Sequence, residues 1–163
     1  MIQILEGTLF IEDTEKFLQK LKKISKEQNI TIQALDADKL AGEEHLRFAG
    51  EKAINSFKTG KNIANDLAKE IMLYAAGTRQ ISRAMKLGVH KGKNNIALVA
   101  IGKAPELSAF SEIAPAPVLQ YSESRKEALM DIFNITEEEI EAVGMDKIPE
   151  LVLERVALVD VIK

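Results

Sequence analysis

The side chains that could transfer protons near neutral pH are two histidines and a small group of carboxylates. His45 and His90 are the two histidines of the chain, and imidazole is the side chain whose ordinary pKa lies closest to neutrality. The carboxylates that could serve His45 as partners lie just before it in the sequence: Asp36, Asp38, Glu43 and Glu44. Asp36 and His45 therefore define one hypothesis, a small enzyme that acts on a nucleotide or acid substrate.

The sequence lacks the motifs of the common catalytic sites. It contains no Walker loop, no G-x-G-x-x-G after a strand, no H-E-x-x-H and no G-x-S-x-G pattern. It also contains no cysteine, which excludes a cysteine nucleophile and thiolate metal ligands. We therefore expect Asp36 and His45 to be structural, with His45 at the border of a helix, and we expect no catalytic centre, cofactor or metal site.

Charge is distributed unevenly along the chain. Residues 71–105 contain six basic and no acidic side chains, and residues 106–163 contain five basic and 13 acidic ones, although the net charge is only −3. Five cations of the acid-free window, which we call the cationic segment, are Arg79, Arg83, Lys86, Lys91 and Lys93. Such a segment favours phosphate groups, unless its charges pair with the acidic last third of the chain.

The cationic segment falls partly on an expected helix over residues 78–87. At 100° per residue, the first three cations would lie within about 60° of one another on one face of this helix. Ile81, Ala84 and Met85 would form an apolar back on the other side. Arg79 and Arg83 carry forked donors that suit phosphate oxygens or carboxylates, so the sequence predicts a largely electrostatic RNA contact.

Hydrophobic spacing predicts one α/β domain over residues 1–163, with a small mixed β-sheet of about four strands packed by about seven helices. The expected strands cover residues 2–10, 30–36, 96–101 and 118–121. Residues 96–101 are continuously apolar, which is typical of a central strand covered on both faces. The expected helices cover residues 14–28, 43–57, 63–76 and 78–87, a segment from 137 onward, and 151–162.

The last turn of the third expected helix, residues 71–76, has no polar face. A turn of this kind is either buried on every side or covered by a partner. We predict that it contributes to a partner-binding surface through Ile71, Met72, Tyr74 and Ala75. The final helix, over residues 151–162, is apolar around most of its circumference and is likewise core or docking surface.

The N-terminal residues do not show a basic region followed by an apolar one, and no apolar run approaches the ~20 residues of a membrane span. We therefore expect a cytoplasmic protein.

An ordered series of short motifs runs through the chain. It begins with L-D-A-D-K-L-A-G-E-E-H-L at residues 35–46, continues through E-I-M-L-Y-A-A-G-T-R-Q-I at residues 70–81, and ends with L-G-V at residues 87–89. In order and spacing the series resembles the small accessory subunit of the KEOPS complex, the family of the PRPK-binding protein TPRKB. The resemblance covers nearly the whole chain and is weakest in the C-terminal third.

The resemblance implies a subunit without its own catalytic centre that binds the small lobe of a PRPK-type, kinase-like ATPase. It also implies an assembly that adds a threonylcarbamoyl group to the adenosine beside the anticodon, with this subunit helping to recruit tRNA through its 3′ acceptor end. A protein-binding scaffold without RNA contact remains the alternative.

Overall fold

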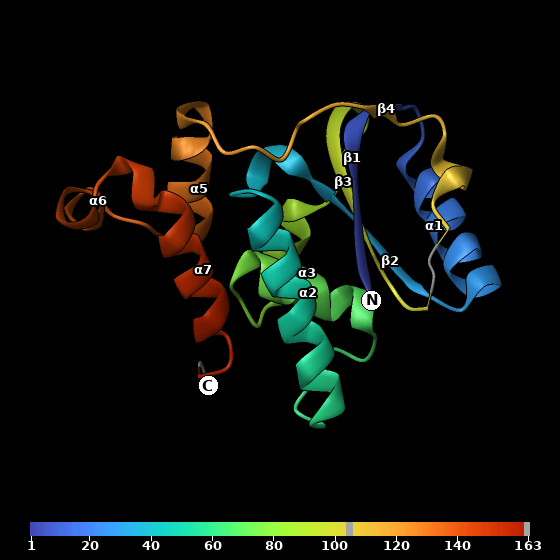
Figure 1. Cartoon of the computed structure of the whole chain (residues 1–163), viewed down its shortest axis with the longest axis horizontal. Coiled ribbons are helices and arrows are strands. Elements are labelled where there is room, and N and C mark those ends of the chain that lie inside the picture. Colours follow the sequence, from blue (N-terminus) through green and yellow to red (C-terminus); the bar gives the residue numbers. More distant parts are fainter. Residues whose placement is uncertain (104–105, 162–163) are drawn as a thin grey trace.

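A four-stranded antiparallel sheet lies at the centre of the protein, in a computed structural model that describes residues 1–103 and 106–161, the Met145 side chain excepted (Figure 1). The order of the strands is β2-β3-β1-β4. Their bounds are Ile2–Ile11 for β1, Thr31–Asp36 for β2, Gly92–Ile101 for β3 and Ala114–Pro115 for β4.

The expected central strand is confirmed, and the α/β fold class with it. β3 pairs with β2 on one side and with β1 on the other, and its residues 96–100 are fully buried. The sheet is antiparallel where we expected it to be mixed. β1 and β2 do run in the same direction, but β3 lies between them and is antiparallel to both.

The strand expected at residues 118–121 is wrong, since the edge pairing falls on β4, where Ala114 lies opposite Thr8. A proline is tolerated there because β4 is an edge strand. Side-chain hydrogen bonds, rather than pairing with another strand, hold the backbone that follows β4. Arg125 donates hydrogen bonds to the carbonyl oxygens of Val118 and Leu119, and the Leu119 N–H donates to Glu6.

Seven α-helices surround the sheet within the described residues. Their bounds are Thr14–Gln28 for α1, Glu43–Lys58 for α2, Leu67–Ala76 for α3, Ile81–Ala84 for α4, Lys126–Phe133 for α5, Glu137–Val143 for α6 and Ile148–Leu158 for α7. Several ends follow local capping chemistry. Asp13 accepts a hydrogen bond from the Lys16 N–H, and Thr136 and Glu139 form a capping box at the start of α6.

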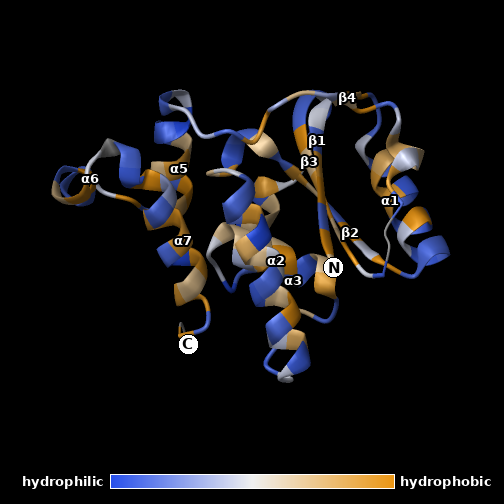
Figure 2. Ribbon diagram, viewed as in Figure 1, coloured by the Kyte–Doolittle hydropathy of each residue, from blue (hydrophilic) through white to orange (hydrophobic). Residues whose placement is uncertain are grey.

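The helices form layers on the two faces of the sheet (Figure 1). α1 packs on one face, in a cluster that includes Phe17, Leu21 and Ile96. α2 and α3 cover the other face, and α5, α6 and α7 lie beyond them, with a small cluster of their own around Leu129 and Ile148. Figure 2 shows hydrophobic and hydrophilic residues along both the strands and the helices. None of the helices described is long and apolar enough to cross a membrane.

Candidate functional site

The apolar turn of α3 is part of the core. Ile71, Met72, Tyr74 and Ala75 expose 3% of their surface or less. β2, α2, α4 and α7 all contact this helix, which explains why it has no polar face. The prediction of a partner-binding surface required these four side chains to be exposed. The structure corrects that expectation, and a docking surface must be sought elsewhere.

The hydroxyl of Tyr74 joins α3 to the end of the chain. It donates a hydrogen bond of 2.5 Å to Asp160, which also forms an ion pair with Lys52 of α2. Burial and the neighbouring carboxylate raise the pKa of Tyr74 well above its usual value. Partial burial alone would raise the pKa of Asp160, but the hydrogen bonds from Lys52 and Tyr74 hold it below its usual value. The role of Tyr74 here is to clamp α2 and α3 to the segment after α7.

His45 is also structural, as expected, although it is fully buried rather than at a helix border. Its Nδ1 accepts a 3.0 Å hydrogen bond from the Ala41 N–H, so its Nε2 carries the proton and donates to the Ala75 carbonyl oxygen at 2.8 Å. Burial lowers the pKa of His45 to about 4. Both ring nitrogens are occupied by backbone groups, so neither is free to exchange a proton with a substrate.

Asp36 ends β2 and caps the short turn that follows it. Its carboxylate accepts a 3.0 Å hydrogen bond from the Asp38 N–H and lies 3.9 Å from both Lys39 and the exposed His90. Burial raises its pKa. Asp36 and His45 therefore bond to separate backbone segments and form no catalytic pair. Among the residues described, no three His, Asp or Glu side chains come together in a way that could hold a metal ion.

Sequence reasoning included Glu70 only as the first residue of the motif at residues 70–81 and gave it no role of its own. Its carboxylate has no exposed surface. It accepts hydrogen bonds from the Ser56 hydroxyl at 2.7 Å and from the N–H groups of Ile63 and Ala64 at 2.8 to 3.1 Å. These bonds fold the connection between α2 and α3 back onto α3. The expected helix over 63–76 accordingly begins only at Leu67.

The cationic segment does not lie on one helix, contrary to the prediction of a helix over residues 78–87. The Thr78 hydroxyl accepts from the Gln80 N–H, and α4 begins only at Ile81. Arg79 precedes the helix and donates to the Val159 carbonyl oxygen. The expected apolar back is wrong as well: Ala84 is buried, but Ile81 and Met85 are exposed.

All five cations of the segment are exposed, and none forms an ion pair with a described residue. The described ion pairs of the last third of the chain are made with other cations, such as Lys20 with Glu112 and Arg155 with Glu139. Arg79 and Arg83 line one hollow together with Gln80, Asn134 and Arg155. The segment therefore retains its positive charge at the surface.

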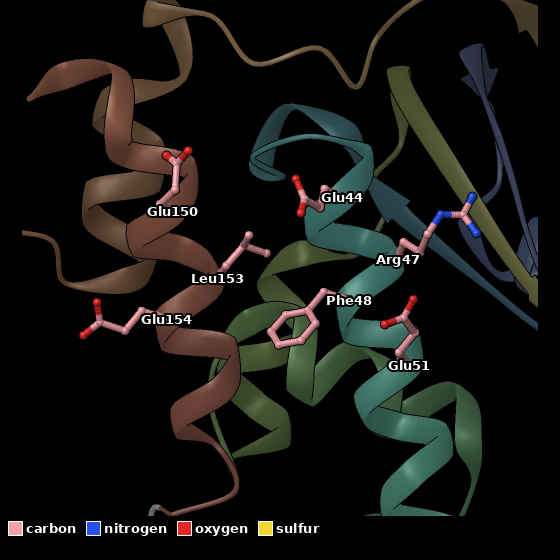
Figure 3. A pocket seen from close by; sticks show the side chains of 7 residues that line it. All are labelled: Glu44, Arg47, Phe48, Glu51, Glu150, Leu153 and Glu154. Carbon is pink, nitrogen blue, oxygen red and sulfur yellow. The ribbon is translucent and has the colours of Figure 1, made fainter.

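A groove between α2 and α7, which sequence reasoning did not find, is the candidate docking site. It has a volume of about 510 Å³ and is lined by Glu44, Arg47, Phe48, Glu51, Glu150, Leu153 and Glu154. In Figure 3 the Phe48 ring and the Leu153 side chain point toward each other between the helices. Both are only half-buried. An apolar centre with four carboxylates and one arginine around it is complementary to a basic surface that presents an apolar side chain.

The available sequence signal for this groove was the apolar character of the final helix. Leu151, Val152 and Val156 of α7 are buried, whereas Leu153 is half-buried and Leu158 is 42% exposed. One side of α7 is thus buried in the core, and the other side is exposed at the surface. The partner face on α2 could not be paired with it from sequence, because roughly a hundred residues separate the two helices.

The buried polar side chains His45 and Glu70 hold backbone segments together. The α2–α7 groove and the cationic segment instead present half-buried apolar and exposed charged side chains at the surface, as in a protein that works by binding other macromolecules. Residues 11–160 match the family described as kinase binding protein CGI-121. The regulatory protein Cgi121 of Methanocaldococcus jannaschii is 30% identical over 138 residues, which cover 82% of this chain and 86% of that protein. The chain therefore belongs to the CGI-121 family of kinase binding proteins, which confirms the resemblance carried by its motifs.

Proposed function

We propose that this protein is a non-catalytic, cytoplasmic regulatory subunit of a KEOPS-type complex. In this role it binds the small lobe of a PRPK-type, kinase-like ATPase and helps to recruit tRNA for threonylcarbamoylation of the adenosine beside the anticodon. The observation that carries the proposal is the family match over residues 11–160, whose description is a kinase binding protein. The regulatory name of the archaeal relative supports the same role.

The α2–α7 groove is our candidate for the kinase contact. Phe48 and Leu153 supply half-buried apolar surface that a partner side chain could cover. Glu44, Glu51 and Glu150 would attract a basic rim on the kinase. These groups replace the core residues of α3 as the expected kinase-binding surface.

The kinase contact is tested by changing Leu153→Glu and titrating the kinase subunit. We expect at least a tenfold loss of affinity, because the new carboxylate would be desolvated in an already acidic groove. Val143→Glu is the matched control, since Val143 is 45% exposed on α6 and does not line the groove. Unchanged affinity of the Leu153 variant, with both variants folded by circular dichroism, would exclude this groove as the kinase site.

The cationic segment is our candidate for the tRNA contact, which would involve the 3′ acceptor end. Its five exposed cations lack carboxylate partners among the described residues. No Phe, Tyr or Trp side chain lies among these cations in the sequence, so phosphate attraction would dominate over base stacking.

The RNA contact is tested with Arg83→Glu and labelled tRNA at several salt concentrations. We expect weaker binding that is similar for different tRNA sequences, and a log-affinity against log-salt slope reduced in magnitude by roughly 0.7 to 0.9. Lys147→Glu is the matched control, because it makes the same change in net charge at an exposed residue of the acidic last third of the chain. Equal affinities and slopes for all three proteins would favour a scaffold that does not contact RNA.

A further inference from the structure

The outer edge of β2 is an open edge of the central sheet. β2 pairs with β3, and no described strand pairs with its other side. α1 lies on one face of the sheet beside this edge, and α3 lies on the other (Figure 1). A groove of about 550 Å³, which we call the β2-edge groove, runs between these two helices and includes residues 31–33 of β2.

The register of the sheet shows which backbone groups face this groove. The Gly102 N–H donates to the Met1 carbonyl oxygen at 3.2 Å, so the even-numbered residues at this end of β3 direct their backbone groups toward β1. The odd-numbered residues of β3 therefore face β2 and bond to Thr31, Gln33 and Leu35. Ile32, between them, directs its N–H and C=O away from the sheet, into the β2-edge groove.

The neighbouring outward group on β2 is already protected. The side-chain amide of Gln33 donates a 2.9 Å hydrogen bond to the Ala34 carbonyl oxygen. The Gln33 side chain therefore occupies one hydrogen-bonding position of the edge. Many proteins protect sheet edges in this way against uncontrolled strand pairing. No described strand or side chain does this for Ile32.

The walls of the β2-edge groove are apolar on both sides. α1 contributes Leu18, which is 36% exposed, and α3 contributes Leu67, which is half-buried. Met85, which follows α4 and is 58% exposed, extends the α3 side. A strand added to β2 would lie about 4.8 Å from it, with alternate side chains toward the two walls. It would cover apolar surface on both faces.

The rim of the groove is basic. Lys22 and Lys26 project from α1, and neither forms an ion pair with a described residue. On α3, Lys69 is 3.8 Å from Asp66, whose carboxylate also accepts from the Lys69 N–H as the helix cap. The aspartate is thus already engaged, and the remaining charge of the rim favours an acidic occupant.

Like charges make a second copy of this chain a poor occupant, because β2-to-β2 pairing would oppose the lysine rims of both copies. The apolar walls and the absence of an aromatic side chain among the lining residues disfavour single-stranded RNA. We propose that the β2-edge groove binds an extended acidic segment of a partner protein, which adds to the free edge of β2 as a strand. This site shares no lining residue with the α2–α7 groove and does not depend on the proposed kinase contact.

The proposal is tested with a labelled peptide that has a core of isoleucine and valine flanked by two glutamates at each end. We expect saturable binding by fluorescence polarisation and slower hydrogen exchange at the Ile32 amide in the complex. The same peptide with N-methylated core amides keeps its side chains but cannot pair with a strand, and we expect its affinity to fall more than tenfold. Equal binding of the methylated peptide would overturn strand addition.

Charge reversal tests the rim. Lys22→Glu combined with Lys26→Glu should weaken the peptide at least tenfold, whereas Lys16→Glu combined with Lys58→Glu, two exposed lysines outside the groove, should leave it unchanged. An equal loss of peptide affinity in both double variants would show that only the net charge matters, which would contradict the proposal. Self-association through β2 without peptide binding, or displacement of the peptide by a single-stranded RNA, would assign the groove to a different occupant.

Discussion

Lowering the pH from 7.5 to 5 should weaken the fold through the single buried histidine. The pKa of His45 is about 4 in the folded protein, against an ordinary pKa of 6.5 for an unperturbed histidine. The pKa is depressed on folding, so the resulting stability is fully present above pH 6.5 and is lost as the pH falls toward 4. At pH 5 the two values correspond to a loss of about 2 kcal/mol, since one pKa unit is worth about 1.4 kcal/mol.

His45→Gln isolates this contribution. The glutamine amide can still donate to the Ala75 carbonyl oxygen, but the Ala41 N–H loses its acceptor, which should cost about 1 kcal/mol at pH 7.5. Because glutamine does not titrate, the variant escapes the loss at pH 5. We therefore expect the order to reverse: the variant is less stable than the wild type at pH 7.5 and more stable at pH 5.

Urea unfolding at the two pH values measures both differences. Carboxyl groups whose pKa is shifted by the fold, such as Asp36, Glu139 and Asp160, are present in both the wild type and the His45 variant. Their contributions to the pH dependence of stability therefore cancel in the comparison. Parallel losses of stability in the wild type and the His45 variant would refute the assignment of a buried, neutral imidazole.

Two further changes test the core around α3. Met72→Ala should lower the free energy of unfolding by about 2 to 5 kcal/mol. Met72→Glu should lower it further because it buries an unpaired charge. A small effect of either change on thermal unfolding would show that Met72 is exposed and not part of the core. Glu70→Gln should cost about 1 to 3 kcal/mol, because one amide oxygen must replace two carboxylate oxygens. Hydrogen exchange at the Ile63 and Ala64 amides should become faster in this variant, and unchanged exchange would contradict the role of Glu70 in holding the α2–α3 connection.

The elements that sequence reasoning located correctly are those governed by local chemistry. Asp13 caps α1, Thr136 and Glu139 form a capping box at the start of α6, and Gly77 ends α3 with a φ of 64°. Each signal involves residues within about four positions of one another, so the sequence contains the whole interaction. The continuous apolar run of β3 identified a buried strand for a similar reason, because burial on both faces leaves no polar position.

The errors occurred where distant contacts override local pattern. Thr78 resembles a helix cap, but its hydroxyl bonds to the Gln80 N–H and Arg79 is drawn to the Val159 carbonyl oxygen, so the helix starts later. The apolar turn of α3 could equally cover a core or a partner. Only the positions of β2, α2 and α7 around it decide between the two, and these are set by tertiary packing.

The uneven charge of the sequence had two interpretations: internal pairing of the cationic segment with the acidic last third, or separate charged surfaces. The ion pairs decide between them for the described residues, because Glu112, Glu137, Glu139 and Asp160 pair with lysines and arginines outside the cationic segment. Glu150 and Glu154 line the α2–α7 groove instead. The last third of the chain thus provides acidic surface around an apolar groove, while the acid-free window keeps its positive charge exposed. A fold that needed these charges for its own stability would have paired them, so their separation supports two binding surfaces of opposite sign on one small domain.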